Sequence, residues 1–258
     1  MFLWIVLVAM KKIIHKAVFL FPLAIIGFGL ISFIFGQLPA AFMPAQAARP
    51  LHSIVVTYAC AVFFIITGMG IIAGIFSAAC ARLIAVFFFI NLIYPQLTLS
   101  LQQFSNAGLW TVTLEILALC SGASMLTRIP AISKLAKYTF ALSFLGFALL
   151  HYMYADYIVT LIPAWMPAHY LLNALVFAGF VGIAASLIFN MYVNLAGICF
   201  GSMFCFWVIT LHLPRCLSSM SKEAEWSSLC IAVAMAGIGF LLAAEDKNQL
   251  PAIAVKTV

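Results

Sequence analysis

Charged side chains are scarce in this sequence. Among its 258 residues, 12 are Lys or Arg and 6 are Asp or Glu, so charged residues make up 7% of the chain and hydrophobic residues 67%. Soluble domains carry about 25% charged residues, because a folded chain needs a polar surface toward water. The scarcity excludes an ordinary soluble globular protein and predicts an integral membrane protein covered by the lipid bilayer.

Motifs of soluble catalysis are also absent. The chain has no P-loop, no G-x-G-x-x-G opening a soluble helix, no H-E-x-x-H and no G-x-S-x-G. Its seven cysteines are odd in number and form no C-x-x-C pair, which favours neither a disulfide framework nor a metal site. The net charge of +6 comes from basic residues scattered between apolar runs. We therefore expect no bound metal and no nucleic-acid partner.

Eight apolar runs are long enough to cross the bilayer as helices, which takes about 20 residues for about 30 Å of hydrocarbon. They cover about 17–36, 53–76, 83–100, 107–126, 138–155, 169–191, 194–212 and 225–244. If the N-terminus is cytoplasmic, nine Lys and Arg residues fall on the cytoplasmic side and three on the other. This bias follows the positive-inside rule. We predict an all-α membrane helical bundle of eight transmembrane helices with both termini cytoplasmic.

The runs divide the chain into five segments. We expect a basic cytoplasmic N-terminus, a first four-helix repeat, a cytoplasmic linker, a second four-helix repeat and a cytoplasmic tail. Their bounds are 1–16, 17–126, 127–137, 138–244 and 245–258. The first long run exceeds the apolar core of a signal peptide, so we interpret it as a retained anchor. Met1 and Met10 are both candidate starts of translation.

The two repeats are indicated by a shift of about 117 residues. This shift aligns Pro50-Leu51-His52 with Pro167-Ala168-His169 and brings Trp110 within one residue of Trp226. Because each half has an even number of spans, both copies would share one orientation in the membrane.

Glu115 lies near the middle of the fourth run, where insertion of a charged side chain costs about 2.5 to 3.5 kcal/mol. It is a candidate catalytic residue, either as a proton carrier or as a partner for a bound polar headgroup. The alternative is a structural Glu that bonds a Ser, Thr or Asn on a facing helix.

Polar and aromatic residues gather in 151–173, between the fifth and sixth runs. His151 is a candidate catalytic and ligand-binding residue, and with His52, His169 and His212 it could form a cluster at the external face. The alternative is interfacial histidines bonded to loop carbonyls. The tyrosines within 151–173, together with Trp165, are interpreted as an aromatic belt or as the entrance of a quinone or lipid site.

Two further polar side chains belong to this region. Asn173 is a candidate ligand-binding residue, with interhelical hydrogen bonding as the alternative. Asp156 is expected to pair with Arg215 across the external face, which contributes about 0 to 1 kcal/mol for an exposed pair.

The stretch FALLHYMYADYIVTLIPAWMPAHYLLN, followed by a Gly-rich helix and a helix ending in LHLP, resembles the DoxX-like membrane proteins. In that family a His shortly precedes a P-x-W-x-P loop, as His151 precedes the loop at 163–167 here. The likeness covers 138–244, whereas the first half lacks the Trp and the early His. It implies a four-helix module and ligand-binding roles for His151, Trp165, His169 and, less directly, His212.

The resemblance also implies a function. Some DoxX-like proteins are similar to a subunit of thiosulfate:quinone oxidoreductase, and others accompany membrane redox complexes. We expect a protein of the bacterial inner membrane that binds a quinone or another amphiphile and assists a redox partner, as a subunit without an independent soluble catalytic domain. A small proton-linked transporter or channel and a structural or assembly protein are the alternatives.

Overall fold

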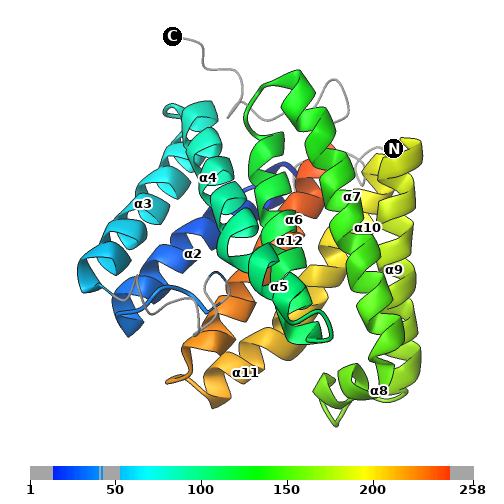
Figure 1. Cartoon of the computed structure of the whole chain (residues 1–258). Helices are drawn as coiled ribbons and strands as arrows, with labels where there is room; N and C mark the ends of the chain where they lie inside the picture. The colour runs from blue at the N-terminus through cyan, green and yellow to red at the C-terminus, as the bar shows by residue number, and fades with distance from the viewer. Residues whose placement is uncertain (1–13, 41, 43–52, 245–258) are drawn as a thin grey trace, which may run out of the picture.

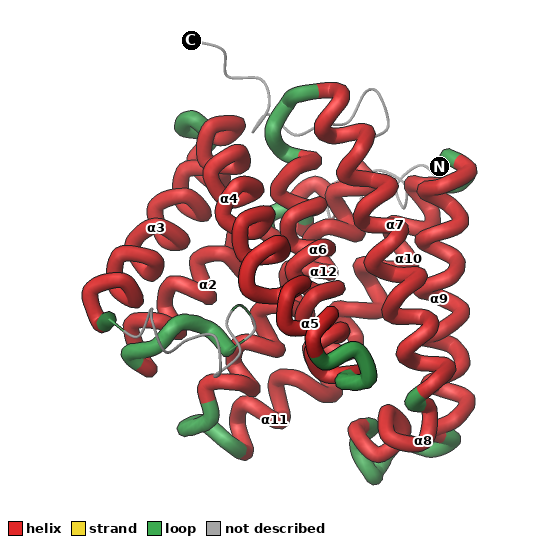
Figure 2. The backbone as a smooth tube through the Cα atoms, in the orientation of Figure 1, coloured by secondary structure: helices red, strands yellow, loops and turns green. Residues whose placement is uncertain are grey.

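The computed structural model describes residues 14–40, 42 and 53–244 (Figure 1). These residues form helices joined by short connections, without a strand among them (Figure 2). Eight of the helices are long and apolar enough to cross a membrane. The predicted number and order of the spans are therefore confirmed. His52, both candidate start residues and the predicted tail lie outside the described residues.

The helices fall into two halves, residues 14–125 and 130–244. The first half contains α2 (Leu20–Phe35), α3 (Ile54–Ala73), α4 (Ser77–Asn91), the π-helix η2 (Leu92–Leu97), α5 (Thr98–Gln102) and α6 (Ala107–Met125). The second half contains α7 (Pro130–Met153), α8 (Ala155–Ile158), the 3₁₀-helix η3 (Val159–Leu161), α9 (His169–Phe189), α10 (Val193–Trp207), the π-helix η4 (Val208–His212), α11 (Leu213–Ser218) and α12 (Glu223–Ala244).

The third long helix of each half changes its winding near one end. In the first half the regular hydrogen bonding ends at η2, where Pro95 lacks a backbone N–H and Tyr94 has extended angles (φ −144°, ψ 117°). In the second half η4 precedes α11, which has Pro214 in its first turn. Because η4 continues directly into α11, Pro214 lies inside a continuous helix, next to the π-helical turns where the regular hydrogen bonding is already interrupted. Each third span is therefore a helix of 26 residues that contains a π-helical segment.

The linker predicted at 127–137 is mostly helix, because α7 begins at Pro130. Pro130 is well suited to start a helix, so most of this basic segment belongs to the same helix as the fifth apolar run. The short turn before α7 is tied to α4: the Arg82 guanidinium donates to the Thr127 carbonyl at 3.4 Å from Nε and from one terminal nitrogen.

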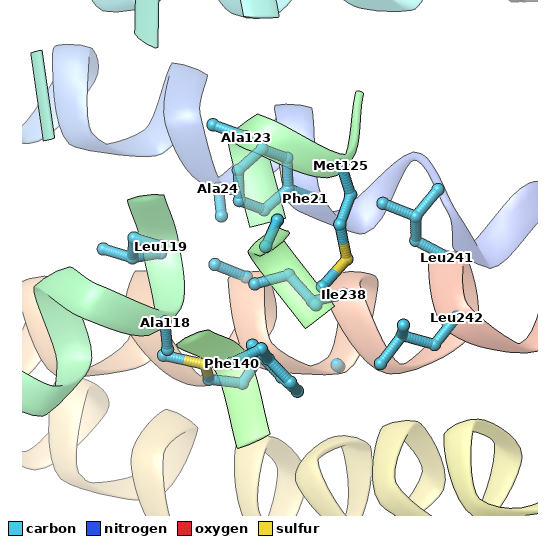
Figure 3. Close-up of a cluster of buried hydrophobic side chains, with 14 of the residues drawn as sticks. Phe21, Ala24, Ala118, Leu119, Ala123, Met125, Phe140, Ile238, Leu241 and Leu242 are labelled. Carbon is cyan, nitrogen blue, oxygen red and sulfur yellow. The ribbon is translucent and has the colours of Figure 1, made fainter. Parts of the chain in front are cut away.

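Helix α12 forms the centre of the bundle and packs against α2, α6 and α10. Figure 3 shows the apolar side chains where these helices meet α7, including Phe21, Leu119, Phe140 and Ile238. Against α10 the backbones approach closely, since a Cβ added at Gly197 would lie 2.6 Å from the Gly239 carbonyl oxygen. Small residues allow this approach, which strengthens van der Waals packing between membrane helices.

The short helices α8 and α11 lie at one end of the bundle, at the bottom of Figure 1, and the turn between α6 and α7 lies at the other. The C-terminal end of α7 and the N-terminal ends of α6, α9 and α12 therefore share the end that carries the short helices. This arrangement brings Glu115, His151, Asn173 and His212 into one region.

Candidate ligand-binding cavity

A cavity of about 470 Å³ lies between helices of the second half and α6 of the first half, toward the end that carries α8 and α11. Its walls come from α6, α7, α8, α9, α10, η4 and α12. Most of the lining is apolar, but Glu115, His151, Asn173 and His212 all contribute to it. Four residues selected from the sequence therefore share one cavity. An apolar cavity with a few polar side chains is typical of a small-molecule site.

His151 and Asn173 form a fixed pair in the wall. The Asn173 amide nitrogen Nδ2 donates to the His151 backbone carbonyl at 3.2 Å, which orients the amide oxygen toward the imidazole. That oxygen accepts from His151 Nδ1 at 2.7 Å. Nδ1 therefore carries the proton, and in the neutral ring Nε2 is the free acceptor. No described residue bonds Nε2, so the histidine offers an acceptor to the cavity.

The ring of His151 is also held by its surroundings. Its centroid lies 5.1 Å from that of Phe180 in an edge-to-face arrangement at 88°. Asn173 is buried, with 7% of its surface exposed. A buried amide with both ends engaged has little freedom to turn, and so the imidazole is pre-oriented before any ligand arrives.

Glu115 reaches the same cavity from α6. Its carboxyl group has no hydrogen-bond partner among the residues that the structure describes. The Ser, Thr or Asn partner of the alternative interpretation is therefore absent within that part of the chain. An intramembrane acid that faces a cavity without a partner is a candidate functional group.

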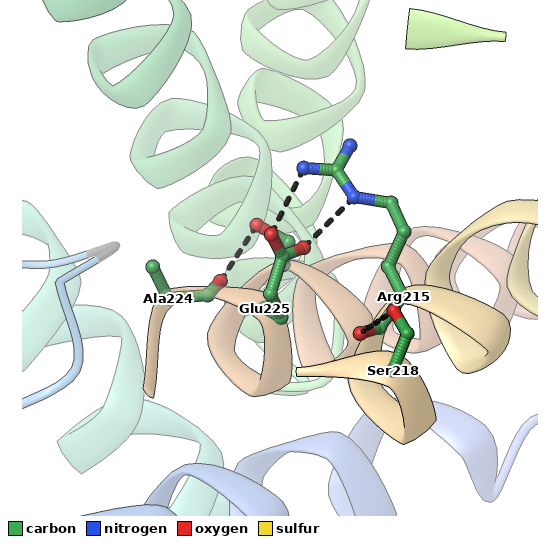
Figure 4. Close-up of polar contacts among 5 residues, drawn as sticks. Arg215, Ser218, Ala224 and Glu225 are labelled. Carbon is green, nitrogen blue, oxygen red and sulfur yellow. Dashed lines mark hydrogen bonds and ion pairs between the residues drawn. The ribbon is translucent and has the colours of Figure 1, made fainter. Parts of the chain in front are cut away.

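His212 lines the cavity at the end of η4, one turn before Arg215. Arg215 bonds Glu225 through two nitrogens, with Nε 2.9 Å from Oε2 and the terminal nitrogen donating to Oε1 at 3.0 Å (Figure 4). The predicted pair of Arg215 with Asp156 is therefore wrong. Glu225 on α12 is nearer to Arg215, and Asp156 instead accepts a hydrogen bond from the Tyr170 hydroxyl at 3.0 Å.

Trp165 and His169 do not line this cavity. Trp165 is 70% exposed on the connection before α9. The Nε2 of His169 donates to the Pro163 carbonyl at 3.3 Å, which matches the alternative of an interfacial histidine bonded to the loop. The structure thus separates the candidate histidines: His151 and His212 share the cavity, and His169 stabilises the loop beside it. Ligand binding by Trp165 and His169 stays a prediction.

Other cavity residues escaped the sequence analysis. Thr111 lies one helical turn before Glu115, and Trp207 ends α10. The spacing of four residues between Thr111 and Glu115 was a usable signal, because it puts both on one helix face. Trp207 carried no such signal, since it stands in an aromatic-rich run.

Within the described ranges, no three His, Cys, Asp or Glu side chains gather as metal ligands. Comparisons of the chain with protein-family models, with curated proteins and with solved structures find no match.

Proposed function

We propose that this chain is a multi-pass protein of the bacterial inner membrane that binds an amphiphile with a quinone-like head in the cavity beside His151. The observation that carries the proposal is an apolar cavity of about 470 Å³ in which Glu115, His151, Asn173 and His212 converge. Such a site suits a molecule that is apolar except for a few hydrogen-bonding groups.

The reduced form of the head fits the fixed tautomer best. A quinol hydroxyl donates to Nε2 of His151, while Asn173 keeps Nδ1 protonated. Glu115, which has no partner in the described chain, supplies a second polar contact from α6. The protein would then act as an accessory subunit that presents the quinol to a redox partner in the membrane.

A DoxX-like architecture of two repeated four-helix units is part of the proposal. Several features support the duplication: α4 and α10 each have 15 residues, and their bounds differ by 116 positions at both ends. Gly74 and Phe76 have left-handed backbone angles, and so do Asn190 and Tyr192, which lie 116 positions later in the chain.

Two tryptophans support the same relationship. The Trp110 indole donates to the carbonyl six residues earlier at 2.9 Å, and the Trp226 indole does so at 3.1 Å. The positive-inside bias supports an orientation in which the cavity faces the external side, and that orientation is part of the proposal.

The test is binding of a tailless benzoquinol to the purified protein in lipid nanodiscs, followed by calorimetry. Replacing His151 by Leu removes the acceptor Nε2 and should weaken binding by about tenfold or more, the effect of one hydrogen bond to a desolvated group. The matched control is His15→Leu, because His15 is exposed on the first span and does not line the cavity. Equal losses in both variants, or no binding by the unmodified protein, would refute the proposal.

Glu115 favours a second candidate function, proton-linked transport. The supporting observation is its carboxyl group in the cavity without a partner in the described residues. In proteoliposomes with an imposed proton gradient, Glu115→Gln should keep the fold and abolish proton-coupled uptake. Full uptake by that variant would exclude Glu115 as the carrier.

A further inference from the structure

A second cavity, of about 520 Å³, lies between α9 and α10. It is lined by apolar side chains and small residues of these two helices and of the turn that joins them. Its one aliphatic hydroxyl, that of Ser186, already donates to the Met191 carbonyl. At its rim Phe189 and Tyr192 are 72% and 76% exposed, so the cavity opens on the outer surface of the bundle.

Met203 lines both cavities. On the facing helix, Phe180 belongs to the wall of the first cavity and the neighbouring Gly179 to that of the second. The two spaces therefore follow one another along α9 and α10 with the Met203 side chain between them. Methionine is unbranched and adapts its shape at low cost, so this boundary can yield to a flexible chain.

We propose that the two cavities hold one ligand: the polar head lies beside His151, and a long hydrocarbon tail passes Met203 and fills the space between α9 and α10. This inference rests on the proposed function and adds the chemical class of the ligand, an amphiphile with a long hydrocarbon tail. From Asn173 to Ser186 the helix α9 rises about 20 Å at about 1.5 Å per residue, which sets the reach that the tail needs.

Gly182 provides a selective way to fill the second cavity. It lines that cavity, and a Cβ added there meets no heavy atom within 4 Å. Gly182→Leu therefore extends into open space without displacing a neighbour, and the change from Gly favours the helix. The matched control is Ala178→Leu, because Ala178 is exposed on the same helix and lines neither cavity.

The experiment compares two ligands on these variants in nanodiscs: a tailless benzoquinol and the same head with a geranylgeranyl tail. Gly182→Leu should weaken binding of the tailed quinol about tenfold and leave the tailless quinol unchanged, whereas Ala178→Leu should change neither. A photoreactive group at the end of the tail should label the peptide that contains the α9–α10 turn.

Three other results are possible, and each leads to a different conclusion about the ligand. If Gly182→Leu leaves tailed binding intact, the tail lies elsewhere, a separate lipid chain can occupy the second cavity, and this inference fails while the proposed function stands. If the variant weakens both ligands equally, the cavities do not divide head from tail, which also overturns the inference. If neither quinol binds the unmodified protein, the proposed function fails as well.

Discussion

The two halves of the bundle fill corresponding ends differently. In the first half the connection between α2 and α3 sends Phe42 into the interior, where it is 1% exposed. Its ring centroid lies 4.5 Å from that of Phe28 and 5.3 Å from that of Phe88. In the second half the connection between α7 and α9 lines the cavity with Tyr154 and Tyr157. The first half therefore fills this end with the side chain of Phe42, and we call it the closed end. The second half has a cavity at the corresponding end.

Two side chains hold the closed end. Gln96 Nε2 donates to the Phe42 carbonyl at 2.7 Å, and the Glu223 carboxylate accepts from the Ala40 N–H at 3.2 and 3.3 Å. A displacement of 116 residues puts His212 of the cavity wall at the position of Gln96. Under the proposed duplication, a few positions decide between a packed end and a binding site.

The largest effect is expected from Phe42→Ala. Removing a fully buried ring from a cluster of four other phenylalanines leaves a void, and such changes cost about 3 to 5 kcal/mol. The unfolding temperature of the purified protein should therefore fall strongly. The matched substitution is Ile158→Ala at the cavity wall, which removes a half-buried side chain beside space that already exists and should cost less. Similar losses in the two variants would show that the side chains beside the cavity are packed as tightly as Phe42.

A smaller effect is expected from Glu223→Gln. Glu223 is buried, lies in the first turn of α12 and also accepts a hydrogen bond from the Ser227 hydroxyl. Bonds to a charged acceptor contribute about 1.5 to 3 kcal/mol each, and the neutral amide retains part of that. We expect a loss of about 1 to 2 kcal/mol, measured by chemical unfolding. Unchanged stability would show that Glu223 does not hold the closed end.

The sequence predicted the spans because hydropathy and length alone decide which segments cross a bilayer. It also selected Glu115, His151, Asn173 and His212, because polar side chains are conspicuous in a chain that is 7% charged. The sequence did not predict that Asn173 orients the imidazole of His151. The pairing with His151 depends on α7 and α9 being antiparallel neighbours whose ends meet, which is a tertiary fact.

The remaining errors have a similar cause. Arg215 was assigned to Asp156 because that acid was the only one in the neighbouring loop, yet the turn after α11 brings Glu225 closer. Phe42 and Gly182 gave no signal, since one Phe among 24 and one Gly among 15 look alike until the helices are packed. The shape of a cavity follows from how helices cross, and composition does not encode that directly.

The smallest effect is expected from Glu225→Gln, which sharpens the contrast with the buried Glu223. The side chains of Arg215 and Glu225 are 43% and 19% exposed, so water screens their attraction. Exposed ion pairs contribute about 0 to 1 kcal/mol, and that contribution falls as salt rises. The variant should therefore unfold within about 1 kcal/mol of the unmodified protein, and the difference should shrink in high salt. A loss as large as that of Glu223→Gln would mean that the pair beside His212 supports the cavity wall as firmly as Glu223 supports the closed end.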